Sequence, residues 1–263
     1  MIVDFGGADK TGESPTFLKL RTAGDAFIAL LCLWWVLLAV FSAFPEIDLA
    51  VARVFFDNEQ CTAVAAVAAV SKVCGFFPYA DDQHMRFLRQ GLLLLPYIVA
   101  GVLCWMLFAC MQHHGATFQS ERARNLQAAL GSLVIGPIVI VNFGLKAFSG
   151  RPRPRDTDLF GGMLDFMHAG SFAGKCVANC SFVSGEAAGA GWLFCLIWII
   201  PQPLRAALAL PIGAISIIIP AMRVAFGAHY LSDVVLGWLS SPVAFAAVIA
   251  LSQTTHIRKI SKV

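Results

Sequence analysis

Between residues 146 and 233, three clusters of ionisable and hydroxyl side chains interrupt long apolar runs. They contain Lys146 and Arg153, then Ser184, Gly185 and Glu186, and finally Arg223, His229 and Asp233. Ionisable groups beside lipid are costly to place and indicate a functional site by default. Transfer of a phosphoryl group requires cations around its non-bridging oxygens and a nucleophile in line with the leaving oxygen. We therefore interpret the three clusters as one phosphate site.

The third cluster carries a group that can attack phosphorus. His229 and Asp233 are four residues apart, so their side chains can meet on one face if Asp233 begins a helix. A carboxylate bonded to one ring nitrogen fixes the tautomer of the imidazole and leaves the other nitrogen free to attack. The pair can therefore act as a nucleophile and its orienting group.

The other groups suit an anion. The cations of the first and third clusters offer positive charge, and Ser184 and Gly185 stand where a loop enters an apolar run, so that helix N–H groups can face a phosphate. Simpler explanations exist for each piece: a basic loop at the membrane edge, a helix cap, or an interfacial histidine. Gly189 and Gly191 would then only let helices approach closely. The occurrence of all three clusters on one predicted face of the membrane favours the functional interpretation.

The composition is that of a membrane protein. Of the 263 residues, 58% are hydrophobic and 13% are charged, and the mean hydropathy is +0.74. A soluble domain has about a quarter of its residues charged. The net charge of +3 is small, and the basic residues occur in short groups between apolar runs, a pattern that reflects membrane topology. We expect a polytopic membrane protein and no nucleic-acid partner.

The apolar runs predict an all-α bundle of six membrane-spanning helices in one domain that covers residues 1–263. A helix needs about 20 apolar residues to cross a bilayer. The expected spans are residues 25–44, 87–111, 126–145, 182–200, 204–222 and 234–251. Residues 1–24 form a polar lead without the small-residue cleavage site of a signal peptide.

Two segments after the first span are expected at the membrane surface. Ile47 and Val54 share helical spacing with other apolar residues, against Asp48 and Arg53, which is typical of an interfacial amphipathic helix. The segment Cys61–Pro78 is Ala-rich and short for a span, so we expect a surface-lying or partly inserted helix there.

The basic residues predict the orientation in the membrane. Lys19 and Arg21 precede the first span, which places the N-terminus in the cytoplasm. Six spans then return the C-terminus to the cytoplasm, and they place further basic residues there, namely Arg122, Arg124, Arg205, Arg258, Lys259 and Lys262. The loop at 146–185 and His229 would lie on the outer face. In a Gram-negative bacterium that face of the inner membrane is the periplasmic one.

Cysteines and histidines outside the clusters are candidates for disulfides and for metal ligands. The cysteines in predicted outer segments are Cys61, Cys74, Cys176 and Cys180. An oxidising compartment permits disulfides among them, but the pairing cannot be deduced from sequence. His113 and His114 lack a Cys or carboxylate at ligand spacing and are interpreted as part of a solvated loop. We expect no metal and no cofactor, because the cations can neutralise the phosphate.

The spacing of these motifs resembles the type 2 phosphatidic acid phosphatase (PAP2) superfamily. Lys-x6-Arg-Pro begins at Lys146, Ser-Gly at Ser184, and Arg-x5-His-x3-Asp at Arg223. The resemblance implies a phosphatase in which His229 attacks phosphorus to form a phosphohistidine and Asp233 orients it. It also implies a set of phosphate ligands, namely Lys146, Arg153, Ser184, Gly185 and Arg223.

Two positions depart from the family pattern, which usually has Pro-Ser-Gly-His in the second motif and Ser-Arg in the third. This chain has Glu186 after Gly185, and Met222 before Arg223. The missing histidine normally protonates the leaving oxygen. Glu186 would take that role if partial desolvation kept it protonated. The alternative is that it favours the helix dipole or pairs with Arg153.

Further segments resemble the lipid A phosphatase branch, and its 4'-phosphatases in particular. They are Phe44–Asp48, Gly150–Pro154, Phe160–Gly162 and Ser181–Glu186. This resemblance implies a lipid A substrate whose headgroup is ringed by accessory cations, namely Arg151, Arg155 and Lys175. The alternatives are a phosphatidylglycerophosphate or undecaprenyl pyrophosphate phosphatase, a lipid phosphotransferase, or a non-catalytic lipid-binding protein or permease. An enzyme needs His229 for turnover, whereas a carrier would keep binding without it.

Overall fold

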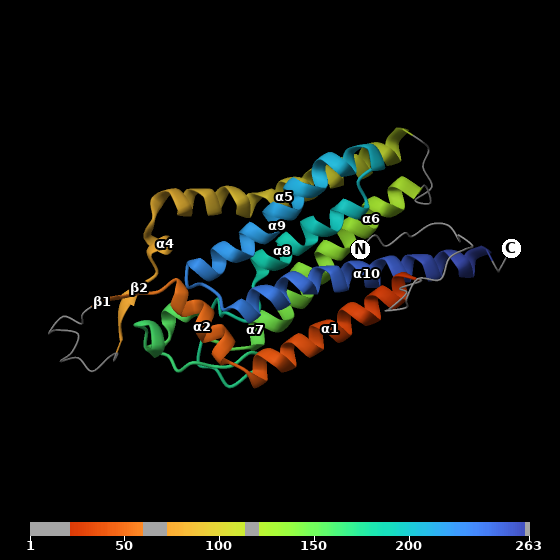
Figure 1. Cartoon of the computed structure of the whole chain (residues 1–263). Helices are drawn as coiled ribbons and strands as arrows, with labels where there is room; N and C mark the ends of the chain where they lie inside the picture. The colour runs from red at the N-terminus through yellow and green to blue at the C-terminus, as the bar shows by residue number, and fades with distance from the viewer. Residues whose placement is uncertain (1–21, 60–72, 114–120, 261–263) are drawn as a thin grey trace, which may run out of the picture.

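The computed structural model describes residues 22–59, 73–113 and 121–260. Expectations about residues 1–21, Cys61, His114 and residues 261–263 lie outside this part of the chain. The bundle consists of α1 (Ala23–Ala43), α5 (Gln83–His113), α6 (Glu121–Leu133) with its continuation η1 (Val134–Leu145), α8 (Gly185–Cys195), α9 (Gln202–Ala225) and α10 (Leu231–Ile260). These helices run in alternating directions between the two ends of the bundle (Figure 1).

Shorter elements gather at the end of the bundle where α10 begins (Figure 1). They are α2 (Glu46–Val54), β1 (Asp57–Glu59), β2 (Cys74–Phe76), α4 (Pro78–Asp81), α7 (Lys146–Phe148), η2 (Pro154–Asp156) and η3 (Asp158–Phe160). The two strands pair antiparallel, with Asn58 opposite Gly75. Of the surface helix expected over Cys61–Pro78, residues 61–72 lie outside the described part of the chain, and residues 74–76 form a strand instead.

The prediction of an all-α membrane bundle is confirmed. Within the described residues, five helices are long and apolar enough to cross a membrane, namely Ala23–Ala43, Gln83–Gln112, Arg122–Leu145, Gln202–Ala225 and Leu231–Gln253. The expected fourth span at residues 182–200 is wrong in length, because α8 has 11 residues and only the short turn η4 (Leu196–Trp198) follows it. A helix of this length rises about 16 Å, roughly half the thickness of the hydrocarbon core.

The short helix α8 is enclosed by the rest of the bundle. It contacts α5, α6, η1, α9 and α10. A Cβ on Gly191 would lie 2.2 Å from the carbonyl oxygen of Trp238, so glycine is what allows α8 to approach α10 this closely. Because protein covers α8, the bilayer thickness does not dictate its length.

The third expected span is built from α6 and the π-helix η1. Pro137 cannot donate a backbone hydrogen bond, and Asn142 Nδ2 donates to the Pro137 carbonyl oxygen at 2.8 Å. This span ends at Leu145 and is followed directly by Lys146, the first cation of the predicted site.

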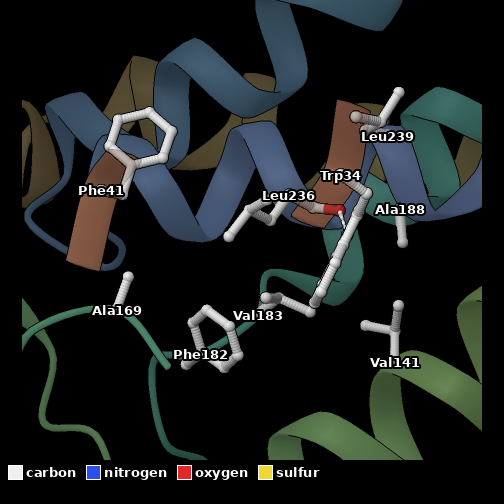
Figure 2. Packing of buried hydrophobic residues seen from close by; sticks show 9 residues of the cluster. All are labelled: Trp34, Phe41, Val141, Ala169, Phe182, Val183, Ala188, Leu236 and Leu239. Carbon is white, nitrogen blue, oxygen red and sulfur yellow. Dashed lines mark hydrogen bonds between the residues drawn. The ribbon is translucent and has the colours of Figure 1, made fainter. Parts of the chain in front are cut away.

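The first span packs against the last one. Trp34 Nε1 lies 3.0 Å from the Leu236 carbonyl oxygen and 3.1 Å from Ser240 Oγ, and can donate to both. Figure 2 shows the surrounding buried cluster, which joins α1, η1, α8, α10 and the loop before α8 through Trp34, Phe41, Val141, Ala169, Phe182, Val183, Ala188, Leu236 and Leu239. This packing fixes the start of α10, which carries Asp233.

The burial of helix α2 follows its amphipathic pattern only in part. Val54 is 77% exposed and Ile47 is 37% exposed, whereas Asp48 and Ala52 are each only 1% exposed. One charged residue, Asp48, therefore points into the protein, whereas Glu46 and Arg53 are exposed. Leu49, Val51 and Phe55 pack partly against the core.

Candidate active site

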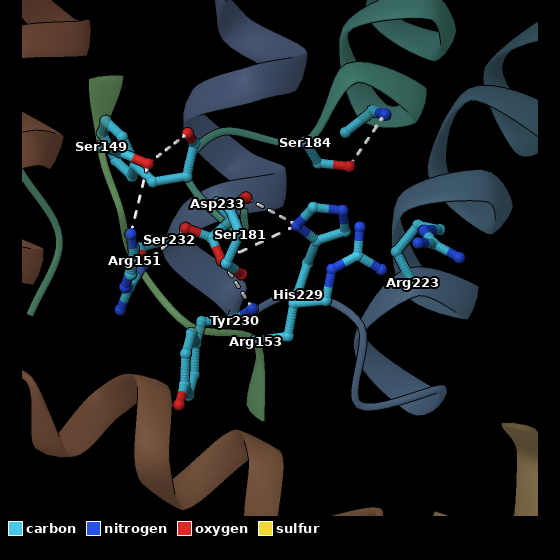
Figure 3. A network of polar contacts seen from close by, with 12 residues as sticks. Ser149, Arg151, Arg153, Ser181, Ser184, Arg223, His229, Tyr230, Ser232 and Asp233 are labelled. Atoms are coloured by element: carbon cyan, nitrogen blue, oxygen red, sulfur yellow. Dashed lines mark hydrogen bonds and ion pairs between the residues drawn. The ribbon is translucent and has the colours of Figure 1, made fainter. Parts of the chain in front are cut away.

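The predicted clusters converge where the 149–184 loop meets the start of α8, the end of α9 and the start of α10. Figure 3 shows Arg153, Ser184, Arg223 and His229 together, with Asp233 beside the histidine, next to Ser181 and Ser232. Lys146 lies beside Gly185 and Glu186 in the lining of one cavity, and its charge interacts with Arg153 and Arg223. The structure thus brings together the three clusters that lie far apart in the sequence.

Local backbone structure holds Ser184 and His229 in place. Ser184 is the N-cap of α8: its Oγ accepts from Ala187 N at 3.4 Å, and its own N–H donates to the Asp233 carbonyl oxygen at 3.0 Å. His229 follows a tight turn after α9, where Gly227 has a φ of +57° and its N–H donates to the Val224 carbonyl oxygen. Both residues therefore belong to helix ends that face the same space.

The hydrogen bond of the His229 ring defines its tautomer. Nδ1 lies 2.8 Å from the Ser181 carbonyl oxygen, and a carbonyl oxygen can only accept. Nδ1 therefore carries the proton, and Nε2 keeps its lone pair. In Figure 3 the ring lies between Ser181 and the two guanidinium groups of Arg153 and Arg223. This arrangement supplies an unprotonated nitrogen next to cations.

The expectation that Asp233 bonds directly to the ring is wrong in detail. Asp233 Oδ2 lies 3.8 Å from His229 Nδ1, which is longer than a hydrogen bond. The same oxygen accepts from Ser181 Oγ at 2.5 Å and from Tyr230 N at 2.9 Å. Asp233 thus fixes the residue whose carbonyl oxygen orients the ring, and its charge acts on the ring from a short distance.

Burial and neighbouring charge set the protonation of the site. Burial lowers the pKa of His229 to about 4, against the opposing effect of Asp233, and the positive charges of Arg223 and Arg153 lower it further. Burial also lowers the pKa of Lys146 from its usual value, with contributions from the same two guanidinium groups. His229 is therefore neutral at pH 7, as a nucleophile must be.

Glu186 is held by two guanidinium groups. Arg89 on α5 contacts both of its carboxylate oxygens, with Nε 3.2 Å from Oε2. Arg223 Nε lies 3.4 Å from Glu186 Oε1 and has no hydrogen-bond partner among the described residues. Contact with two cations favours the ionised carboxylate. The expected partner Arg153 instead donates from Nε to the Asn179 carbonyl oxygen at 2.9 Å.

Arg151 corrects the prediction of an accessory headgroup cation. Its side chain is fully buried and forms ion pairs with Asp233 and Asp48. A buried guanidinium needs such partners, and two carboxylates supply them. The other two predicted headgroup cations are accessible: Arg155 is 48% exposed beside Asp156, and Lys175 is 72% exposed with Nζ 3.3 Å from an Asp165 oxygen.

An apolar cavity of about 200 Å³ opens beside the polar site. Leu92, Pro96 and Ile138 are among its apolar lining residues, and Lys146 and Glu186 stand at its polar end. Such a cavity can take an apolar part of a ligand next to its anionic part.

A disulfide closes the loop next to Arg153. Cys176 and Cys180 are bridged, and Asn179, whose carbonyl oxygen binds Arg153, lies between them at a φ of 53°. Cys74 is disulfide-bonded as well. The sequence had left open whether these cysteines pair. In the described part of the chain, no three His, Cys, Asp or Glu side chains gather as a set of metal ligands.

Sequence reasoning missed Arg89, Asp48 and Ser181. Arg89 lies within the expected second span, and an arginine inside an apolar run was an available signal. Asp48 lies on a helix whose other charged residues, Glu46 and Arg53, are exposed, so the pattern gave no sign of its burial. Ser181 acts through its backbone carbonyl oxygen, for which a side-chain motif gives no sign.

The sequence of this chain is similar to a family of known proteins and to individual named proteins. A family model described as the PAP2 superfamily matches residues 126–257. The chain belongs to the PAP2 superfamily. It is 54% identical over 251 residues to a Rhizobium etli protein named lipid A 4'-phosphatase, covering 95% of this chain and 96% of that protein. A Rhizobium leguminosarum protein of the same name is 57% identical over 231 residues, covering 88% of this chain and 98% of that one.

Two more distant proteins are also similar to this chain, one in part of its sequence and one in its structure. A Francisella tularensis subsp. novicida protein, also named lipid A 4'-phosphatase, is 36% identical over 109 residues, covering 39% of this chain and 47% of that protein. The crystal structure of a PAP2 type phosphatidylglycerolphosphate phosphatase from Bacillus subtilis aligns with a TM-score of 0.50 at 14% identity, covering 87% of this chain and 96% of that chain. The PAP2 fold is thus retained at low identity.

Proposed function

We propose that this multi-pass membrane protein is a lipid phosphatase that removes the 4'-phosphate of lipid A through a phosphohistidine at His229. Two relatives named lipid A 4'-phosphatase, at 54% and 57% identity over most of the chain, support the substrate. The observation that carries the mechanism is the His229 hydrogen bond to the Ser181 carbonyl oxygen, which leaves Nε2 free to attack.

The proposed reaction has two displacements at phosphorus. In the first, the lone pair of His229 Nε2 forms the P–N bond, the P–O bond to the sugar breaks, and the departing oxygen takes one proton from a water molecule. In the second, water attacks the phosphohistidine, gives up one proton to the hydroxide left by the first step, and breaks the P–N bond. Inorganic phosphate leaves, and the ring is neutral again. Lys146, Arg153 and Arg223, with the start of α8 at Gly185, would bind the non-bridging oxygens.

The role of Glu186 in this scheme is the organisation of cations. Its carboxylate already binds Arg89 in two contacts and lies beside Arg223. An arriving phosphate would offer the unpartnered Nε of Arg223 an anion, while Arg89 keeps Glu186 in place. The competing possibility is the proton-donor role that the family resemblance suggests. The two roles predict a different dependence of the rate on the leaving group.

We also propose that the site faces the periplasm and that both termini are cytoplasmic. The first residues of α1 and the last residues of α10 lie at the end of the bundle opposite the site (Figure 1). Arg122, Arg124 and Arg205 belong to that same end and agree with the positive-inside rule. A lipid A headgroup in the outer leaflet would then meet Arg155 and Lys175, which are exposed.

The test is a substrate panel with purified protein in detergent and EDTA. We expect inorganic phosphate and 4'-dephosphorylated lipid A from lipid A, and much slower release from phosphatidylglycerophosphate and undecaprenyl pyrophosphate. His229→Ala should release none. A phosphotransferase would instead pass the phosphate to another lipid, and a carrier would bind lipid A equally well in the His229→Ala variant. Activity that is lost in EDTA and restored by a divalent ion would contradict a reaction based on side-chain cations alone.

A further inference from the structure

A buried ion-pair chain links the surface helix α2 to the start of α10. Arg151 Nη2 lies 2.8 Å from Asp48 Oδ2, and Arg151 Nη1 lies 2.6 Å from Asp233 Oδ1. Each of the three side chains is at most 1% exposed. Two carboxylates therefore share one guanidinium in the interior.

Further hydrogen bonds and a cation–π contact hold the side chains of Arg151 and Asp48 in place. Ser232 donates to Asp48 from its backbone N at 2.8 Å and from Oγ at 2.6 Å, and Arg151 Nη1 donates to Ser232 Oγ at 2.8 Å. Arg151 Nε donates to the Met167 carbonyl oxygen at 2.8 Å, and the guanidinium carbon lies 4.4 Å from the centre of the Tyr230 ring. A satisfied buried network of this kind fixes the side chains that belong to it.

The chain of contacts ends on the candidate nucleophile. Asp233 accepts from Ser181 Oγ at 2.5 Å, and the Ser181 carbonyl oxygen accepts from His229 Nδ1 at 2.8 Å. The position of the ring therefore depends, through Asp233, on the group that holds the other carboxylate oxygen.

The charges of this ion-pair chain suit a phosphorylated histidine. With both carboxylates ionised and one guanidinium between them, one negative charge remains unbalanced. A ring that binds phosphorus at Nε2 and keeps its proton at Nδ1 carries a positive charge, and a fixed negative charge nearby stabilises it. Without Asp48, Arg151 would neutralise Asp233 completely.

We propose that Asp48 and Arg151 are positioning residues of the phosphatase reaction, with Asp48 holding Arg151 and Arg151 holding Asp233 for His229. This inference rests on the proposed function. Neither residue reaches the phosphate, because both are buried behind Asp233.

The test is Asp48→Asn, which keeps the shape of the side chain and removes its charge. We expect kcat on lipid A to fall about 10- to 100-fold, as small displacements of a reacting group do, with KM little changed. KM should hold because the phosphate-binding cations do not contact Asp48. The matched control is Glu46→Gln on the exposed side of the same helix, which should keep the wild-type kcat.

A second variant keeps the inference testable if Asp48→Asn fails to fold. Ser232→Ala removes one hydroxyl between Asp48 and Arg151 and should lower kcat less, again at constant KM; Ser241→Ala, a buried hydroxyl that bonds to the Ala188 carbonyl oxygen, is its control. A wild-type kcat in both Asp48→Asn and Ser232→Ala, or an effect confined to KM, would overturn the inference. Inactive wild-type protein would refute the proposed function instead.

Discussion

At the scale of single residues, the chemistry depends on which nitrogen of His229 carries its proton. The Ser181 carbonyl oxygen lies 2.8 Å from Nδ1 and therefore keeps the proton there. Asp233 acts indirectly, because it accepts a hydrogen bond from the Ser181 hydroxyl. No side-chain substitution removes a backbone carbonyl oxygen. The hydrogen bond from His229 to Ser181 therefore depends on the position of the loop before α8. The residues that hold that loop therefore affect the nucleophile.

The protonation of His229 can be measured directly. Its pKa of about 4 lies below the ordinary histidine value of about 6.5, so the ring should stay neutral as pH falls from 6.5 and gain its proton only near pH 4. NMR of ¹³C-histidine-labelled protein should show one resonance with this behaviour, absent from His229→Gln. If every histidine titrates near pH 6.5, the conclusion that His229 is held neutral by burial is wrong.

Glu186→Gln separates its two possible roles. If Glu186 organises Arg89 and Arg223, the variant should slow a lipid phosphate and an activated aryl phosphate to the same extent, by about 10-fold or more, with a raised KM. A proton donor would matter far less for the aryl phosphate, whose leaving group needs little protonation. A large loss on the lipid alone would restore Glu186 as the acid.

Residues within one motif were predictable because their spacing is local. Ser184 as a helix cap follows from helix geometry, and the four-residue spacing of His229 and Asp233 brings their side chains near each other, although not into a direct hydrogen bond. The ion pairs of Glu186 with Arg89 and of Arg151 with Asp48 cross 97 and 103 residues, and no local rule constrains such pairs. This is why the sequence placed Arg151 at a headgroup while the fold buries it.

At the scale of elements, the loop closed by Cys176 and Cys180 positions a phosphate ligand. Replacing both cysteines by serine should free the Asn179 carbonyl oxygen from Arg153 and raise KM several-fold with a smaller change in kcat. Steady-state kinetics would measure this, with Cys104→Ser as the control because Cys104 is exposed and unbridged. An unchanged KM would show that the loop holds Arg153 without the disulfide.

Helices were predicted in number and order better than in length. Hydropathy fixes a span only where lipid covers the helix, as it does for α5, which has no buried residue in its apolar window. The enclosed α8 follows different limits, since Gly191 against the Trp238 carbonyl oxygen sets its packing. On α2 the hydropathy pattern also gave no sign that Asp48 turns toward protein while Val54 is exposed.

At the scale of the whole molecule, the orientation in the membrane is testable. Met163 is 77% exposed near the site, and Gln202 is exposed at the start of α9 at the other end of the bundle. In intact spheroplasts a membrane-impermeant thiol reagent should label Met163→Cys, and it should label Gln202→Cys only after permeabilisation. The reverse pattern would place the site in the cytoplasm.

The central claim, a phosphohistidine at Nε2 of His229, is tested most directly by trapping it. Protein mixed with ³²P-labelled lipid A phosphate should be quenched in alkali within one turnover and digested, and the labelled peptide sequenced. The label should sit on His229, and ³¹P NMR should identify the Nε2 isomer, since Nδ1 is occupied by its bond to the Ser181 carbonyl oxygen. Label on another residue, the Nδ1 isomer, or full turnover by His229→Ala would contradict the mechanism.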